Sequence, residues 1–349
     1  MNANNKLDIR KLDLDQIKEF VISAGQPAFR AKQIYEWLWQ KGETSFDGMS
    51  NLSKEFREIL KNQFEIRSIK LDTIQHSLDG TIKSRFELYD GHKIESVLIP
   101  VPVDQRFTLC VSIQVGCSLS CKFCATGQME RIRNLDVAEV YDQYVEVNRQ
   151  CLVAYGHPLT NVVYMGMGEP LLNYSNTMAS IDKLTSPEGL NISPKRITVS
   201  TAGIAKMIRR MADEDTKVNL ALSLHAADDK KRNMIMPINE QNNLEVLMEA
   251  LTYFYKKTGN KISYEYIAFK NFNDGIEDAK NLVRLCKSFP VKVNIIEYNP
   301  IAGLDFVKSD EDAINKFALH LRKNEVICTI RRSRGKDIDA ACGQLANKE

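Results

Sequence analysis

The spacing of apolar side chains divides the chain into a helical first part and a longer part in which strands and helices alternate. Apolar residues recur at helical spacing in residues 12–25, 27–42 and 51–64, which predicts three helices. From about residue 107 onward, short apolar runs alternate with amphipathic stretches. Such alternation is typical of a parallel sheet with right-handed helical crossovers, either open or closed into a barrel. We therefore predict a small helical domain followed by a larger α/β domain.

A β-hairpin is predicted between these two parts, because residues 81–100 alternate apolar and polar side chains around Asp90-Gly91. The predicted strands of the α/β part are residues 108–115, 161–166, 196–200, 218–225, 262–269 and 293–299. Its predicted helices are residues 136–150, 173–185, 203–212, 243–257 and 275–289, followed by a helix at 310–324 and a strand at 326–332. In folds of this class, binding and catalytic side chains gather at the carboxyl ends of the strands.

Composition places the chain among ordinary globular proteins. Of its 349 residues, 44% are hydrophobic and 26% are charged, which suits one large domain or two domains. The sequence has no apolar run of about 18 residues, the length that a membrane-spanning helix requires. Because its first residues also lack the pattern of a signal peptide, we predict a cytoplasmic protein without membrane contact. A net charge of +2 does not by itself indicate a nucleic-acid partner.

The eight cysteines fall into distinct groups. In a long cytosolic chain, cysteines more often indicate metal binding, catalysis or packing than disulfides. Cys151, Cys286 and Cys328 lie singly within apolar stretches, where we expect them to pack as small hydrophobic residues. Packing would also account for Cys110, which lies in the first strand of the α/β part. The tail around Cys342, however, has too few apolar residues to bury a thiol by itself.

The other three cysteines, Cys117, Cys121 and Cys124, have the spacing C-x3-C-x2-C directly after that strand. Three thiolates on one loop can converge on one metal centre. A structural zinc ion would need four ligands, and no fourth cysteine or histidine lies nearby in the sequence. A [4Fe–4S] cluster held by three cysteines instead leaves one iron open to a further ligand. We favour the cluster over zinc or a chance arrangement.

The motif GCSLSCKFCATG, with Phe123 between the second and third cysteines, resembles the signature of the radical S-adenosylmethionine (SAM) enzymes. The resemblance implies a partial (β/α)6 barrel, a [4Fe–4S] cluster on Cys117, Cys121 and Cys124, and SAM bound to the open iron. In that superfamily, an electron from the cluster cleaves SAM and gives a 5′-deoxyadenosyl radical. A reducing partner such as a flavodoxin would supply the electron.

Candidate SAM contacts lie at the ends of predicted strands, where the mouth of the barrel is expected. Gly168 and Glu169 follow the second of these strands, and we expect them to reach the methionyl ammonium group. The other candidates end or follow later strands: Ser200, Ser223, Leu224, His225 and Asn299. A single serine or asparagine in such a place is typical of a turn or a cap. Polar groups at four successive strand ends are together better explained by a ligand in the mouth.

Nearly the whole chain resembles the RlmN-type methyltransferases, which methylate C2 of an adenine in 23S ribosomal RNA and in transfer RNA. The resemblance covers FRAKQIYEWLWQKG, VSIQVGCSLSCKFCATG, VVYMGMGEPLLN, ITVSTAGI, LALSLHA, YNP and RRSRGKDIDAACGQLA. A sister, Cfr-like activity methylates C8 of the same ribosomal base with the same cysteines, and GMGEPLLN and RRSRG favour C2. A second alternative is a non-catalytic iron–sulfur protein that binds RNA or transfers electrons, which would have no use for Cys342.

The resemblance implies chemical roles for three further residues. Cys342 takes a methyl group from one SAM molecule, and a second SAM supplies the radical that removes a hydrogen atom from this methyl group. The resulting carbon radical adds to C2 of adenine, which lies between two ring nitrogens and is electron-poor. Glu95 is implied as the base that removes the C2 proton. Cys110 then attacks the sulfur of Cys342, and a transient disulfide forms as the methylated RNA leaves.

This interpretation divides the chain into four segments: residues 1–75 as a helical RNA-binding domain, 76–102 as a hairpin connector that carries Glu95, 103–337 as the radical SAM core, and 338–349 as the tail with Cys342. We expect Gly335 and Gly343 to bend the tail, and Ala340 and Ala341 to let it pass close to the site.

The RNA substrates, 23S ribosomal RNA and transfer RNA, require basic side chains for their phosphates. Those predicted beside the tail are Arg331, Arg332, Arg334 and Lys336. In the N-terminal helices, the candidates are Arg10, Lys11, Arg30 and Lys32. We expect the protein to act as a monomer.

Overall fold

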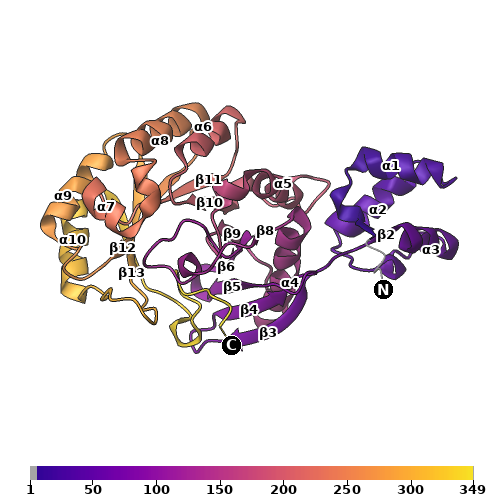
Figure 1. The fold of residues 1–349 in the computed structure, drawn as a ribbon, viewed down its shortest axis with the longest axis horizontal. Coiled ribbons are helices and arrows are strands. Elements are labelled where there is room, and N and C mark those ends of the chain that lie inside the picture. Colours follow the sequence, from indigo (N-terminus) through magenta and orange to yellow (C-terminus); the bar gives the residue numbers. More distant parts are fainter. Residues whose placement is uncertain (1–5, 349) are drawn as a thin grey trace.

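A mixed β-sheet forms the centre of the molecule (Figure 1). The computed structural model describes residues 6–348, and within this range the sheet has ten strands in the order β14-β13-β12-β11-β10-β9-β6-β5-β4-β3. Their bounds are β3 Lys70–His76, β4 Ile82–Glu87, β5 Lys93–Val101, β6 Arg106–Cys110, β9 Asn161–Tyr164, β10 Ile197–Thr201, β11 Asn219–Ser223, β12 Ile262–Ala268, β13 Val291–Glu297 and β14 Ile327–Arg331. All neighbours from β6 across to β14 are parallel, whereas β5, β4 and β3 extend the sheet by antiparallel pairing.

Helices follow the parallel strands and cover the outer side of the sheet (Figure 1). They are α4 Val137–Tyr155, α5 Tyr174–Thr185, α6 Ala205–Asp213, α7 Asp229–Ile235, α8 Leu244–Thr258, α9 Ile276–Leu285 and α10 Glu311–Lys323. The units that begin with β6, β9, β10, β11, β12 and β13 form the predicted partial (β/α)6 barrel. None of the helices within residues 6–348 combines the length and apolar content that crossing a lipid bilayer requires.

One predicted strand, residues 108–115, is wrong as a single element. The structure ends β6 at Cys110 and places a separate short strand, β7, at Gln114–Val115. β7 leaves the central sheet and pairs with β8 (Arg133–Asn134) in a two-stranded sheet. The apolar pattern continues through this break because residues 111–115 are all buried. The break turns the chain toward the loop that carries the three clustered cysteines.

Besides the two-residue β8, three further strands were not predicted, because the apolar pattern does not mark them. Every residue of β3 is solvent-exposed, so this edge strand has no buried face that alternation could reveal. The parallel pair β1 (Leu7–Asp8) and β2 (Phe64–Glu65) is too short for any periodicity. β3 nevertheless matters for the architecture, since it completes an antiparallel β3–β4–β5 unit beside the barrel.

The three N-terminal helices form as predicted, at one end of the molecule (Figure 1). They are α1 Leu14–Ser23, α2 Arg30–Trp39 and α3 Lys54–Gln63. The Asp13 side chain and Gln16 make a reciprocal capping box at the start of α1. α2 packs on α4, where the rings of Trp39 and Tyr141 meet edge-to-face with centroids 5.0 Å apart.

Arg10 joins this helical part to the barrel and is not an RNA contact, contrary to the prediction. Its side chain is only 2% exposed and its Nη1 donates to Oδ1 of Asp142 on α4, at 2.6 Å. Burial raises the pKa of the Asp142 carboxyl group, and the neighbouring guanidinium partly offsets that effect. A charge enclosed in this way cannot meet a phosphate, so the basic surface of the N-terminal helices is smaller than the sequence indicates.

The C-terminal segment returns from β14 to the β3–β4 loop before it reaches the barrel mouth (Figure 1). The Gly335 amide donates to Oδ2 of Asp79 at 2.9 Å, and the Leu78 amide donates to Oδ2 of Asp337 at 3.0 Å. Gly335 and Gly343 have φ angles of +64° and +85°, which confirms the predicted bends. A side chain at Gly335 would also collide, because a Cβ there would lie 2.7 Å from that of Ala340.

Replacing Arg10 by Ala is expected to lower the free energy of unfolding by about 3–5 kcal/mol, because Asp142 would remain buried without its cation. Urea denaturation followed by tryptophan fluorescence measures this, since Trp39 lies at the same interface. The matched control is Lys11→Ala, whose partner Asp136 is solvent-accessible, and we expect a change of less than about 1 kcal/mol there. Equal stability of the two variants would contradict the structural role of Arg10.

Candidate active site

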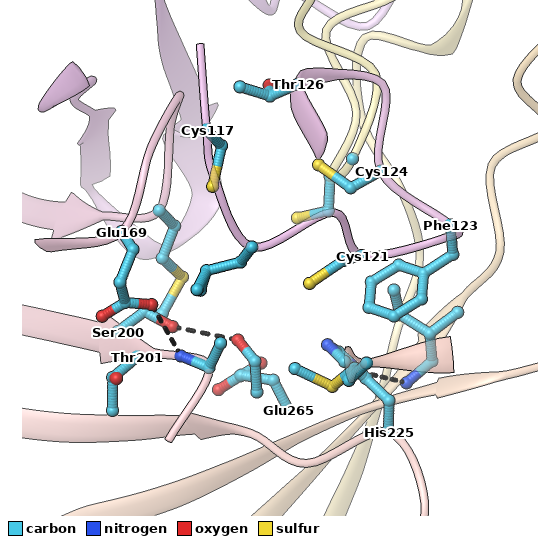
Figure 2. A pocket seen from close by; sticks show the side chains of 18 of the residues that line it. Cys117, Cys121, Phe123, Cys124, Thr126, Glu169, Ser200, Thr201, His225 and Glu265 are labelled. Carbon is cyan, nitrogen blue, oxygen red and sulfur yellow. Dashed lines mark hydrogen bonds between the residues drawn. The ribbon is translucent and has the colours of Figure 1, made fainter. Parts of the chain in front are cut away.

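A cavity lies at the carboxyl ends of the parallel strands and receives side chains from many separate segments (Figure 2). Because neighbouring parallel strands end at the same edge, loops distant in sequence meet there. The predicted site residues that line the cavity are Cys117, Cys121, Cys124, Gly168, Glu169, Ser200, Ser223, His225 and Cys342. The structure therefore brings the cysteine motif, most strand-end candidates and the tail cysteine to one place.

The three motif cysteines surround a shared space, and Figure 2 shows their sulfur atoms pointing into it. Within residues 6–348, no three His, Cys, Asp or Glu side chains converge closely enough to hold a single metal ion. A tetrahedral zinc ion with Zn–S bonds of about 2.3 Å would need sulfur atoms in one tight shell. A polynuclear cluster takes each cysteine on a different iron, and three cysteine side chains from one loop around a shared cavity fit that ligand set.

Local contacts shape this cysteine loop. The Cys124 amide donates to the carbonyl of Cys121 at 3.2 Å, and Gln128 Nε2 donates to the same carbonyl at 3.2 Å. A Cβ at Gly127 would lie 2.7 Å from that oxygen, so the loop requires a glycine there. Burial raises the pKa of the Cys117 thiol to about 11 and those of Cys121 and Cys124 above their usual range. The thiolate forms thus need a positively charged centre beside them.

Glu169 ends the loop after β9 and directs a buried carboxylate at the cavity (Figure 2). Its Oε2 accepts the Ala202 amide at 2.8 Å, and its Oε1 accepts the Leu171 amide at 3.0 Å. Burial raises the pKa of this carboxyl group to about 7, although both amides favour the charged form. A ligand ammonium group would supply the missing positive charge, which fits the predicted SAM contact.

Ser200, Ser223 and His225 lie on the next two strand ends. The hydroxyl groups of Ser200 and Ser223 are 3.3 Å apart, so together they form a polar edge of the cavity. His225 Nδ1 accepts the Ile267 amide at 3.1 Å, and its ring meets Phe123 edge-to-face at 4.7 Å. Burial lowers the pKa of His225 to about 3, so the ring is neutral at physiological pH.

Two predicted SAM contacts, Leu224 and Asn299, do not line this cavity. Leu224 is fully buried, and its backbone binds the Glu265 carbonyl and the Arg232 guanidinium. Asn299 Nδ2 donates to the Cys342 carbonyl at 3.3 Å and therefore contacts the tail instead. The sequence located both residues at strand ends correctly, but strand position alone does not decide which groups face the ligand space.

Two buried residues of the site, Glu265 and Arg232, were not predicted, and Arg331 was predicted only as a phosphate contact. Glu265 in β12 lines the cavity and accepts from Arg331 Nη1 at 3.3 Å, and Arg331 in turn lies beside Cys342. Arg232 is fully buried and donates to the carbonyls of Ala202, Ser223 and Leu224, so it fixes two strand ends. The available signals were a carboxylate within the apolar strand ISYEYIAF and a basic residue that ends β14.

Cys110 and Cys342 share an adjoining cavity, although they lie more than two hundred residues apart in the sequence. Arg331 lines both this cavity and the first one. Burial raises the pKa of Cys110 to about 12, with a further contribution from Cys342. Cys342 as a residue is solvent-exposed, but desolvation of its sulfur within the cavity raises the pKa of the thiol, and Arg331 partly offsets this effect. All eight cysteines are free thiols, so the predicted disulfide between these two is not formed in this structure.

Glu95 lies outside both cavities. It belongs to β5, its side chain is buried, and its carboxylate contacts Lys83 and the backbone of the tail. The sequence placed it in the second strand of the predicted β-hairpin, and the structure confirms this as β5 paired antiparallel with β4. The structure does not bring its carboxylate to the space beside Cys342.

The basic residues beside the tail are largely paired with acidic groups. Arg332 Nη1 and Lys336 Nζ lie 2.6 and 2.7 Å from the carboxylate of Glu297, which is almost fully buried. These cations lower the pKa of Glu297 to about 2 despite its burial. Arg334 instead contacts the backbone carbonyl of Asp79 at 3.3 Å. Of the four predicted phosphate contacts, Arg331, Arg332 and Lys336 therefore form ion pairs in this structure, and Arg334 binds a backbone carbonyl.

Comparison with known proteins identifies the family. The chain is 55% identical to a "Probable dual-specificity RNA methyltransferase RlmN" from Cytophaga hutchinsonii, over 98% of this chain and 93% of that protein. A relative of the same description from Christiangramia forsetii is 52% identical over 99% of this chain and 97% of its own. The chain belongs to the RlmN family of radical SAM methyltransferases.

Two profiles and a solved structure agree with this membership. Residues 7–66 match the ribosomal RNA large subunit methyltransferase N-terminal domain, and residues 111–286 match the radical SAM superfamily. A radical SAM methyltransferase from Sphaerobacter thermophilus superposes with a TM-score of 0.92 at 38% identity, covering 98% of this chain and 100% of that one. Membership in the RlmN family implies that the enzyme uses SAM and a [4Fe–4S] cluster.

Replacing any one of Cys117, Cys121 and Cys124 by Ala is expected to abolish the brown cluster chromophore after anaerobic reconstitution. The reason is that two thiolates leave the cluster without its full set of protein ligands. Iron content and the visible spectrum measure the loss. Cys286→Ala serves as the matched control, because Cys286 is a free, partly buried thiol outside the cavity. Iron retained at the wild-type level in a motif variant would refute the ligand assignment.

Proposed function

We propose that this RlmN-family protein methylates C2 of an adenine in 23S ribosomal RNA and in transfer RNA. The observation that carries the proposal is the position of Cys342, which lines both the cavity of the motif cysteines and the cavity of Cys110. A methyl carrier must first take the methyl group from its donor and later meet the resolving thiol, and the position of Cys342 is suited to both steps. The names of the relatives support the RNA substrates.

Cys117, Cys121 and Cys124 would hold the [4Fe–4S] cluster, and Glu169, Ser200, Ser223 and His225 would contact SAM. When bound, the cluster and SAM supply a carbon radical that can remove a hydrogen atom from a methyl group. Glu169 offers its carboxylate to the methionyl ammonium, and the serine hydroxyls are available to the remaining polar groups. Neutral His225 presents a ring edge and no charge, which suits a cavity that must receive the cationic sulfonium.

Cys342 would carry the methyl group as S-methylcysteine. C2 of adenine is electron-poor, so it does not attack a methyl cation donor, whereas a sulfur-stabilised carbon radical adds to it readily. The tail offers Cys342 without a neighbouring bulky side chain, because Ala341 precedes it and Gly343 follows. Gly343 has φ +85°, and the Ala125 amide binds its carbonyl at 2.7 Å, which holds the cysteine close to the motif loop.

Cys110 would resolve the covalent adduct by attacking the sulfur of Cys342. A disulfide would form, the bond from that sulfur to the RNA methylene would break, and the methylene carbon would keep the electron pair and take up a proton to become the methyl group. The high pKa of Cys110 means that this thiol must lose a proton in the reaction rather than before it. Glu95 is the candidate base for the C2 proton. In the tail position seen here its carboxylate is engaged by Lys83 and tail amides, so a change of tail position must precede that role.

Three further parts of the proposal concern the surroundings of the enzyme. A flavodoxin-like reductant would supply the electron, the enzyme would act as a monomer, and it would work in the cytoplasm, where ribosomal and transfer RNA are available. RNA phosphates would meet the half-exposed Arg331 and Arg332 beside the tail. Because phosphate binding releases counterions, this contact should weaken steeply with added salt.

Anaerobic incubation with SAM, a reductant and unmodified ribosomal RNA tests the proposed function directly. We expect a methyl group on C2 of one adenine, located by mass spectrometry of the digested nucleosides against synthetic 2-methyladenosine. A methyl group on C8 would instead assign the sister activity. Absence of any RNA methylation by cluster-loaded protein would favour a non-catalytic iron–sulfur protein.

Cys110→Ala is expected to stop the reaction with RNA covalently attached to the tail, because no thiol is left to attack the sulfur of Cys342. Denaturing gel electrophoresis with labelled RNA detects the adduct. Cys342→Ala provides the control, since it removes the attachment point and should give neither adduct nor product. Full turnover by Cys110→Ala would remove Cys110 from the mechanism.

A further inference from the structure

The tail lies on one face of the β4–β5 hairpin, and α4 lies on the other. Ser84 and Ser96 bind Gln150 and Gln143 of α4, whereas Arg85 donates to the Lys348 carbonyl of the tail at 2.8 Å. Successive residues of a strand point to opposite faces. Glu95, which neighbours Ser96 and pairs with Arg85 across the hairpin, therefore belongs to the face that the tail covers.

Glu95 and Arg85 both bind the tail from this face, and Glu95 does so with a buried carboxylate. Its Oε2 accepts the amides of Ala346 and Asn347 at 2.9 and 3.1 Å. Its Oε1 lies 3.3 Å from Lys83 Nζ, and the two side chains are only 2% and 6% exposed. Asn347 Nδ2 adds a bond to the Lys93 carbonyl at 2.7 Å. We call Lys83, Glu95 and the two tail amides the tail clasp.

The tail that the tail clasp holds is also bound by hydrogen bonds near the cavity. Asn299 binds the Cys342 carbonyl, and the Ala125 amide binds that of Gly343. Thr126 Oγ1 donates to the Leu345 carbonyl at 2.6 Å, one residue before the tail clasp begins. The reactive cysteine is therefore fixed from the cluster loop on one side and from β5 on the other.

We propose that Lys83 and Glu95 act as positioning residues that dock the tail and hold Cys342 at the cavity, and that docking occupies the carboxylate of Glu95. This inference rests on the proposed function only where it treats Cys342 as the methyl carrier. Both oxygens of Glu95 are engaged while the tail is docked. Undocking of the tail and liberation of the Glu95 carboxylate for a substrate proton are then one event.

The physical basis is the cost of burying ions. A carboxylate and an ammonium group can be buried together when they pair and when hydrogen bonds satisfy the remaining oxygens. The tail supplies two of those hydrogen bonds and also excludes water from the pair. Removing the ammonium leaves a buried, uncompensated carboxylate, and the simplest way to hydrate it is to release the tail that covers it.

Hydrogen exchange of the full-length, cluster-reconstituted protein, read by mass spectrometry without RNA, tests this proposal. We expect the tail peptide with Ala346 and Asn347 to exchange about tenfold faster or more in Lys83→Met and in Glu95→Ala, because local opening sets exchange rates. Lys93→Met is the matched control: its ammonium lies on the same hairpin but pairs with Asp72, and it should leave the tail unchanged.

The double variant K83M/E95Q separates positioning from general destabilisation. It removes both charges but keeps a side-chain carbonyl oxygen that can accept the tail amides, so tail protection should return to within about twofold of wild type. Tail exchange in Lys83→Met and Glu95→Ala equal to that of Lys93→Met would overturn the proposal. Fast exchange of β9 and β10 would show that a single variant has failed to fold. In that case, a folded double variant whose tail protection is not restored would also overturn the proposal.

The outcome is independent of whether the methylation proposal holds. Exchange is measured in the resting protein, so loss of tail protection in the variants supports the tail clasp even when no RNA product forms. Conversely, if the protein methylates RNA through Cys342 but Lys83 and Glu95 do not hold the tail, the proposed function stands and this inference is wrong.

Discussion

The antiparallel pairing of β5 with β6 is the constraint on which the site depends. Its register sets Val97 opposite Cys110, and β6 pairs on its other edge with β9, which leads to Glu169. Strand β6 thus joins the barrel to the β4–β5 hairpin, which binds the tail. A slip of one residue would turn Cys110 to the other face of the sheet and away from Cys342. The buried residues of β5 and β6 resist such a slip.

Around this pairing, the ionisable side chains of the site have little exposure to water. Glu169, His225 and Arg232 are all buried, and each is tied to backbone groups of neighbouring strand ends. These contacts hold the side chains before any ligand arrives, which lowers the entropy that binding must overcome. Desolvation also raises the pKa values of the thiols of the site, so their reactivity depends on a bound group or on the substrate.

The parallel strands, the convergence of their ends and every following helix except the short α7 could be predicted from the sequence, because burial imposes an apolar pattern on each of these elements. The split at residues 111–113 could not, since a buried turn and a buried strand look alike in that pattern. β3 escaped prediction because it has no buried residue. Arg10 was placed on the RNA surface, since a sequence does not show that Asp142 lies 2.6 Å away.

For the site, the cysteine motif was found from its spacing, and the tail cysteine from resemblance. The position of Glu95 beneath the tail was not foreseen, because backbone amides that bind a side chain leave no trace in the residue types. Arg331 and Glu265 were missed as cavity residues for a similar reason, as charged residues in strands usually face solvent. The geometry thus adds what spacing cannot give, namely which groups face each other.

The central claim is that Cys342 receives a methyl group in the cavity of the motif cysteines. Peptide mass spectrometry of the reconstituted enzyme after incubation with methyl-labelled SAM and reductant, without RNA, tests it most directly. We expect one labelled methyl group on the sulfur of Cys342 and none on Cys110. Label on another residue, or an unmodified tail peptide from enzyme that methylates RNA, would contradict it.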